Sequence, residues 1–256
     1  MTFWQAFKAT YTGSVAFLVA CPLLALIPVV FELMQHAAEV HIGMYDSIAA
    51  AKAVEHHPLR MAFGMLKVAA LTLPFYWVIR YLPHRDARFA RMPDRVAIRL
   101  FAVYFAFNIA LAAIQLFGLP QSGAVLAVSF VVSTIIGNLL LAWGVAASLG
   151  NPAIGPRESI VIMARHVPWT FAFTLVVLLP LMIPHYGFAA LGLVGPWMLL
   201  WPGLIVDSLL VGWLTAVMAA GGYYAAVRAA TKAGVDLMPR GAVQGGQPGV
   251  VLGTAT

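Results

Sequence analysis

Long apolar runs separated by short polar segments dominate the chain. Six of these runs approach the roughly 20 apolar residues that a helix needs to cross the hydrocarbon of a bilayer. They are residues 13–35, 61–82, 97–118, 122–149, 168–184 and 204–227. The pattern predicts an all-α, polytopic membrane protein. We expect one transmembrane domain over residues 1–237 and a Gly-rich, disordered cytoplasmic tail over 238–256.

Short segments of mixed polarity precede alternate runs. They are residues 3–8, 93–99 and 156–160. The second and third begin with proline followed closely by an acid, which is typical of a helix start. We therefore expect three helical hairpins, each introduced by a cytoplasmic interfacial helix.

The fifth run is the least regular. It contains Pro180 and Pro184, and an uncharged stretch rich in Gly and Trp follows over residues 185–203. Gly and Pro disfavour a straight helix, whereas Trp favours the membrane interface. We expect an interfacial or re-entrant segment on the outer face, although the pattern leaves a spanning segment open.

Composition excludes a soluble globular protein. Hydrophobic residues make up 62% of the chain and charged residues 9%, whereas soluble domains carry about 25% charged residues. The single cysteine, Cys21, excludes a disulfide within the chain.

The basic residues orient the chain, because loops rich in Lys and Arg stay cytoplasmic. With six spans and both termini cytoplasmic, only Lys52 and Arg60 lie outside, and Lys67 lies within the second run. The other basic residues lie inside: Lys8, Arg80, Arg85, Arg88, Arg91, Arg95, Arg99, Arg157, Arg165, Arg228, Lys232 and Arg240. Short loops and a small chain are typical of a bacterial inner-membrane protein.

A cluster of arginines lies between the second and third runs. Its members are Arg80, Arg85, Arg88, Arg91, Arg95 and Arg99. Near an anionic membrane surface each is worth about 1 kcal/mol, so we expect these residues to contact anionic lipids. They lack the interleaved aromatic residues on which single-stranded nucleic acids stack, and a nucleic-acid partner is not expected.

Carboxylates and histidines gather after the first run. Glu32, His36 and Glu39 are spaced by four and three residues, so one helix would place them on one face. This ligand set suits a divalent metal such as Zn, Mn or Fe, and a metal-bound water could serve hydrolysis. The alternative is an ordinary polar segment facing the outer aqueous phase.

Three ionisable residues lie inside the runs or at their rims. Glu32, Lys67 and Asp207 would each be costly in hydrocarbon without a partner. We expect an ion pair of Lys67 with Asp207 or with Glu32. This pair is either structural or part of a polar pocket that opens outward, with His185 near its mouth.

Neutral polar residues occur in the middle of the third and fourth runs. They are Asn108, Ser129, Ser133, Thr134 and Asn138. We expect them to make hydrogen bonds between helices, each worth about 0.6 kcal/mol.

Two segments carry a family resemblance: Pro156–Ile160 and the end of the last run, Gly221–Tyr224. They resemble the membrane-anchor domains of bacterial glycerophosphodiester phosphodiesterases and related multi-pass proteins. The resemblance implies a multi-pass scaffold, and no catalytic residue transfers with it, since the chain lacks the phosphodiesterase domain.

Three classes of function follow. The favoured class is a non-catalytic membrane protein that binds lipid or a membrane-protein partner. The second is a transporter of a small or lipidic solute. The third is a metal-dependent membrane enzyme that uses Glu32, His36 and Glu39.

Overall fold

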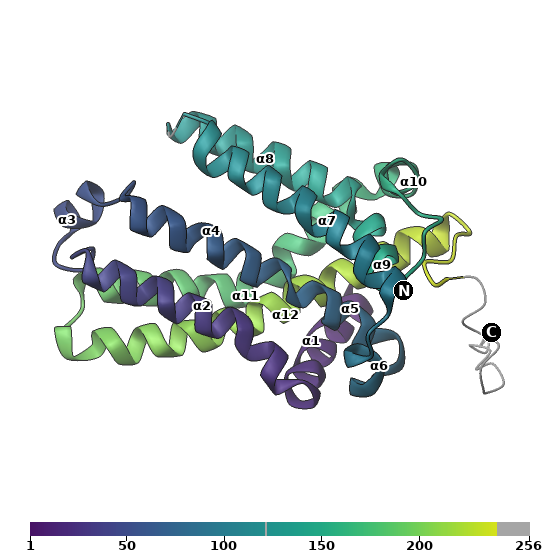
Figure 1. Cartoon of the computed structure of the whole chain (residues 1–256), viewed down its shortest axis with the longest axis horizontal. Coiled ribbons are helices and arrows are strands. Elements are labelled where there is room, and N and C mark those ends of the chain that lie inside the picture. The colour runs from purple at the N-terminus through teal and green to yellow at the C-terminus, as the bar shows by residue number, and fades with distance from the viewer. Residues whose placement is uncertain (121, 240–256) are drawn as a thin grey trace.

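The structure, a computed structural model, describes residues 1–120 and 122–239 (Figure 1). Within these ranges all regular secondary structure is helical, which confirms the predicted all-α class. The longer helices are α1 (Phe3–Ala20), α2 (Pro22–His41), α4 (Pro58–Thr72), α5 (Pro74–His84), α7 (Arg95–Ala113), α8 (Gly123–Leu139), α11 (Val167–Val194) and α12 (Leu200–Lys232). The shorter ones are α3 (Ile48–Ala53), α6 (Ala87–Arg91), η1 (Ile114–Gly118), α9 (Leu141–Leu149), α10 (Pro156–Met163), η2 (Ala164–His166) and η3 (Trp197–Leu199). Most of the predicted tail, residues 240–256, lies outside the described residues.

The described residues form five helical segments that are long and apolar enough to cross a membrane. The pair α8 and α9 makes a sixth if it is counted as one span bent by 46°. The chain is therefore a multi-pass helical membrane protein.

Helix α12 is the centre of the bundle. It packs against α1, α2, α5, α9, α10 and α11, and more of its apolar stretch is buried than in any of the other four continuous candidate spans of the described residues. Small residues allow these close approaches. A Cβ added at Gly212 would lie 2.5 Å from Val29 Cγ2, so α2 and α12 touch at this point.

The first predicted span, residues 13–35, is wrong in its boundaries, because the helix breaks inside it. Helix α1 ends at Ala20, and α2 begins at Pro22 (Figure 1). Proline lacks the amide hydrogen that would continue a helix but suits its first position. Consequently α2 is the candidate span, and α1 is a separate helix packed on α12.

Helix α11 is longer than the fifth predicted span, residues 168–184. It passes through both Pro180 and Pro184 and continues to Val194, so residues 185–194 extend the helix. Neighbouring helices can compensate for proline within a membrane bundle. The turn into α12 follows at Gly195 and Pro196, which leaves residues 195–199 as a short connection.

Two of the three expected interfacial helices are not separate elements. Residues 3–8 begin α1, and residues 95–99 begin α7, which Asp94 caps by accepting hydrogen bonds from the amides of Val96 and Ala97. Only α10, at Pro156–Met163, is a distinct short helix.

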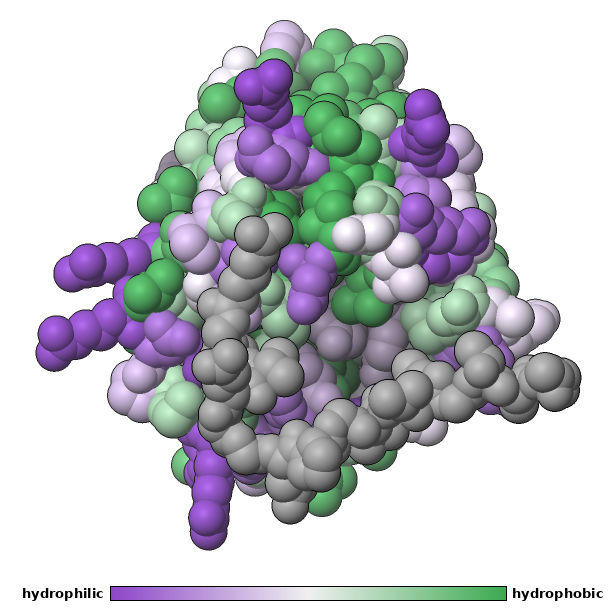
Figure 2. All heavy atoms as spheres, turned by 90° about the vertical axis from the view of Figure 1, so that its right-hand side faces the viewer, coloured by the Kyte–Doolittle hydropathy of each residue, from purple (hydrophilic) through white to green (hydrophobic). Residues whose placement is uncertain are grey.

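The two ends of the bundle differ. Helix α3 and the loops beside it lie at the left of Figure 1, and α6 and α10 lie at the right. Figure 2 looks onto the right-hand end, where hydrophilic side chains project around an apolar centre.

Candidate metal centre

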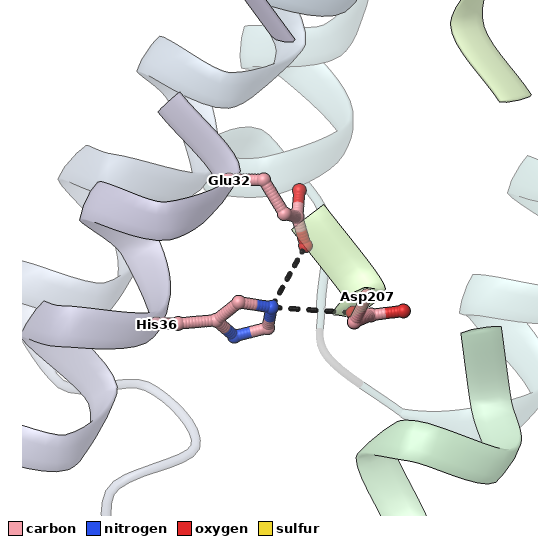
Figure 3. Close-up of side chains that lie close together, drawn as sticks. All are labelled: Glu32, His36 and Asp207. Carbon is pink, nitrogen blue, oxygen red and sulfur yellow. Dashed lines mark hydrogen bonds and ion pairs between the residues drawn. The ribbon is translucent and has the colours of Figure 1, made fainter. Parts of the chain in front are cut away.

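Three buried side chains converge between α2 and α12. His36 Nε2 lies 3.2 Å from Asp207 Oδ2 and 3.5 Å from Glu32 Oε1 (Figure 3). One potential ligand atom from each residue lies within 4.8 Å of the other two. At most 6% of each residue is exposed. The cluster therefore brings together an imidazole and two carboxylates away from water.

Helix α2 supplies the predicted trio, but the trio does not act as one ligand set. Glu32, His36 and Glu39 all lie on the buried face of α2. Glu39 Oε2, however, lies 3.3 Å from Nδ1 of His36, on the opposite side of the ring from Glu32. The third member of the metal-compatible group is instead Asp207, which α12 contributes.

Glu39 is held by three further side chains. Tyr45 Oη donates a hydrogen bond to Glu39 Oε2 at 3.0 Å, and Arg60 Nε donates to Oε1 at 3.1 Å. Gln35 Nε2 also donates to Oε1 at 3.0 Å. Burial and the neighbouring Glu39 carboxylate raise the pKa of Tyr45, so its hydroxyl stays protonated and donates. Glu39 is thus fixed in the position from which it orients the His36 ring.

Lys67 and His185 extend the network beyond Glu32 and Asp207, on the Nε2 side of the His36 ring. Lys67 Nζ lies 2.7 Å from both oxygens of Glu32, so the structure contains one of the two predicted pairings. His185 Nδ1 lies 2.8 Å from Asp207 Oδ1. The residues of the predicted polar pocket, Lys67, His185 and Asp207, therefore belong to the same network as His36.

The charges of this network do not balance. Its three carboxylates, Glu32, Glu39 and Asp207, face two basic side chains, Arg60 and Lys67. With both imidazoles neutral, one negative charge remains. A buried negative charge is costly, so the cluster favours an added cation, either a metal ion or a proton on His36.

Three members of the network had no signal in the sequence: Gln35, Tyr45 and Arg60. Gln35 is an uncharged polar residue on α2 that the spacing argument did not include. Tyr45 is an uncharged aromatic residue in a loop, and Arg60 precedes the second apolar run like an ordinary flanking charge. Their contacts depend on how the loop after α2 folds back, with Gly43 at a φ of +74°.

The prediction that Arg80 contacts lipid together with the other arginines of the cluster is wrong. The Arg80 side chain is 0% exposed and lies 3.7 Å from Asp94 Oδ2. Its guanidinium also lies over the Phe89 ring, at 4.6 Å from the centroid. A buried guanidinium cannot reach a headgroup, so Arg80 ties α5 to the start of α7. The remaining cluster residues are exposed: Arg85, Arg88, Arg91, Arg95 and Arg99.

The mid-span polar residues also differ from expectation. Ser133 and Thr134 donate to carbonyls of their own helix, those of Ser129 and Phe130. Asn108 likewise donates to the carbonyl of Tyr104 on its own helix. Asn138 Nδ2 is buried and has no partner among the described residues.

No protein-family model, curated protein or solved structure matches the chain. The resemblance to phosphodiesterase membrane anchors stays a prediction.

Proposed function

We propose that this multi-pass membrane protein binds one divalent transition-metal ion at Glu32, His36 and Asp207. The observation that carries the proposal is the convergence of three ligand atoms of the types that Zn, Mn and Fe prefer, each within 4.8 Å of the others. The predicted orientation places the site toward the outer face of a bacterial inner membrane.

The surroundings of His36 support this assignment. A metal-bound histidine commonly donates its other ring N–H to a carboxylate, which fixes the tautomer and the ring orientation. Glu39 stands at that position, 3.3 Å from Nδ1, and leaves Nε2 to face Glu32 and Asp207. His185 supports Asp207 through Oδ1 in the same way.

Three protein ligands leave a coordination position for water or a substrate, as in catalytic zinc sites. The ion would act there as a Lewis acid that lowers the pKa of its bound water. This chain would contribute the three ligands and an enclosure of helices α2, α4, α11 and α12.

The test is elemental analysis of protein purified through a tag without histidine and without chelators. We expect about one equivalent of Zn, Mn or Fe in the wild type, since a three-ligand site holds a single ion. The isosteric variants Glu32→Gln and Asp207→Asn should lose it. His41→Gln serves as the matched control, because His41 lies on the same helix but is exposed.

Two results would overturn the proposal. The first is a wild-type protein that holds no metal, even after incubation with each of the three ions. The second is equal metal content in Asp207→Asn and the wild type. In either case a proton on His36 neutralises the cluster, and the network is an internal ion-pair system.

A second candidate function is the binding of anionic lipid by the exposed arginines. The observation that favours it is that Arg88, Arg91, Arg95 and Arg99 are exposed on and beside α6 and the first turns of α7. This surface would anchor the predicted cytoplasmic end of the bundle to acidic headgroups.

A further inference from the structure

A cavity of about 380 Å³ lies among the helices, separate from the polar network. Five helical segments contribute to it: α4 with α5, α7, α8 with α9, α11 and α12. Residues 71–75 fall near the middle of the α4–α5 segment, and residues 215–222 fall near the middle of α12. The cavity therefore lies near the middle of these helices, away from both of their ends.

The walls of the cavity carry no ionisable acid or base other than the phenol of Tyr104, among the described residues that line it. Apolar side chains predominate, and Phe130 and Leu175 are also exposed on the outer surface of the bundle. The cavity is thus bordered by residues that face lipid. These features select an uncharged molecule that enters from the bilayer.

Asn138 makes the cavity favour an occupant that accepts a hydrogen bond. This residue lines the cavity, is 7% exposed, and its amide nitrogen has no hydrogen-bond partner in the described part of the chain. Three neighbouring threonines have already donated their hydroxyl hydrogens to carbonyls of their own helices: Thr72, Thr134 and Thr215. An unsatisfied amide in hydrocarbon is costly, so an occupant with an accepting oxygen is favoured over a plain acyl chain.

Aromatic side chains complete the site. Phe75 and Tyr104 stack with ring centroids 5.7 Å apart, and Phe130 and Phe171 also line the cavity. A flat ring packs well against such faces and edges. The amide nitrogen of Asn138 is buried in the observed orientation. The half-turn that exchanges the amide oxygen and nitrogen preserves the shape of the side chain, so the nitrogen can turn toward an occupant.

We propose that this cavity binds one uncharged, lipid-soluble ring compound through a carbonyl oxygen that accepts a hydrogen bond from Asn138. Quinone headgroups have this chemistry: a flat ring, carbonyl acceptors and an apolar tail. The volume is within the range of small-molecule sites, about 300–1,000 Å³. The proposal is independent of the metal site, since no residue is shared between them.

The test measures binding of decylubiquinone to the purified protein by native mass spectrometry. Decylbenzene is the matched ligand, because it keeps the ring and the tail but lacks the carbonyls. We expect a 1:1 complex with decylubiquinone that is about tenfold weaker with decylbenzene and in Asn138→Leu, the effect of one lost hydrogen bond. Ser133→Ala is the control, because Ser133 lies on α8 outside this cavity and should leave binding unchanged.

A second variant keeps the test decisive if Asn138→Leu does not fold. Thr174→Phe places a ring in the cavity from α11 and should abolish binding while the melting temperature stays at or above that of the wild type. Equal affinity for decylubiquinone and decylbenzene would overturn the proposal, and so would unchanged binding in a folded Asn138→Leu or Thr174→Phe protein.

Discussion

At the scale of single residues, His36 is the junction of the buried network. One ring nitrogen faces Glu39 from its own helix, and the other faces Glu32 and Asp207 from two helices. Every other polar residue of the network bonds to one of these three carboxylates. Replacing His36 would therefore separate the part built on α2 and α4 from the part built on α11 and α12.

Lys67→Met tests how strongly Glu32 depends on its partner. Removing one member of a buried ion pair costs about 3 kcal/mol or more, because the other charge stays buried. We expect a lower melting temperature, and a larger stabilisation by added zinc than in the wild type, since Nζ no longer competes for the Glu32 oxygens. The double variant Glu32→Gln/Lys67→Met should recover stability, and its failure to do so would argue against the pair.

Tyr45→Phe tests the support of Glu39. The variant removes one hydroxyl that donates to a buried carboxylate and leaves the ring in its place against Leu200 and Leu204. We expect a loss of about 1.5–3 kcal/mol in the free energy of unfolding, the range for hydrogen bonds to charged groups. Denaturant titration in detergent measures it, and Tyr186→Phe, at an exposed tyrosine, is the control.

The sequence could predict part of this site but not all of it. Glu32, His36 and Glu39 are found from their spacing, because a helix fixes which residues share a face. Asp207 is found as a costly charge in an apolar run and was grouped with Lys67 and His185, but nothing in the sequence connects it to His36. Its place beside His36 depends on the packing of α2 against α12, which includes the contact at Gly212.

At the scale of elements, close helix packing depends on a few glycines. A Cβ at Gly144 of α9 would lie 2.5 Å from Cζ of Tyr104 on α7. Phe101 and Trp143 pack against the Tyr104 ring, so the ring could yield to such a Cβ only by moving into the cavity that it lines.

Gly144→Ala should therefore destabilise the fold by about 1–3 kcal/mol through overpacking. Gly64→Ala is the matched control, since nothing lies within 4 Å of a Cβ there. The control should be neutral or slightly stabilising, because alanine favours helix over glycine. Melting curves of both variants in one detergent decide the matter, and equal destabilisation would show that the contact at Tyr104 is not the cause.

The exposed arginines of α6 and α7 give a prediction for lipid binding. The variant Arg88→Gln/Arg91→Gln/Arg95→Gln/Arg99→Gln should copurify with less anionic phospholipid, because each residue is worth about 1 kcal/mol near an acidic surface. Lys52→Gln, at the opposite end of the bundle, should not change the lipid content. Equal amounts of bound lipid in all three proteins, measured by mass spectrometry of extracted lipids, would contradict the prediction.

Proline shows why element boundaries were harder to predict than element type. Pro22 starts a new helix, whereas Pro180 and Pro184 lie inside α11. The local residue preferences are similar in the two places. What differs is the packing: α11 runs along α12, and this long contact favours a continuous helix.

At the scale of the whole molecule, the predicted orientation can be tested by cysteine labelling. In a Cys21→Ser background, Lys52→Cys should react in intact cells with a thiol reagent that does not cross membranes. Lys232→Cys should react only after the cells are opened, because positive loops remain cytoplasmic. Both lysines are exposed, so accessibility alone does not separate them. The reverse labelling pattern would invert the orientation and place the proposed metal site toward the cytoplasm.

The distribution of charges over the helical hairpins has a consequence for biogenesis. The ribosome completes α12 last, so the earlier helices enter the membrane before the central helix exists. The α2–α4 pair already carries its own counter-charges, Glu32 with Lys67 and Glu39 with Arg60. Asp207 arrives together with His185 from the adjoining helix α11. The α2–α4 pair can thus insert as a neutral unit, whereas Asp207 enters hydrogen-bonded to His185 and keeps its negative charge until assembly brings it beside His36.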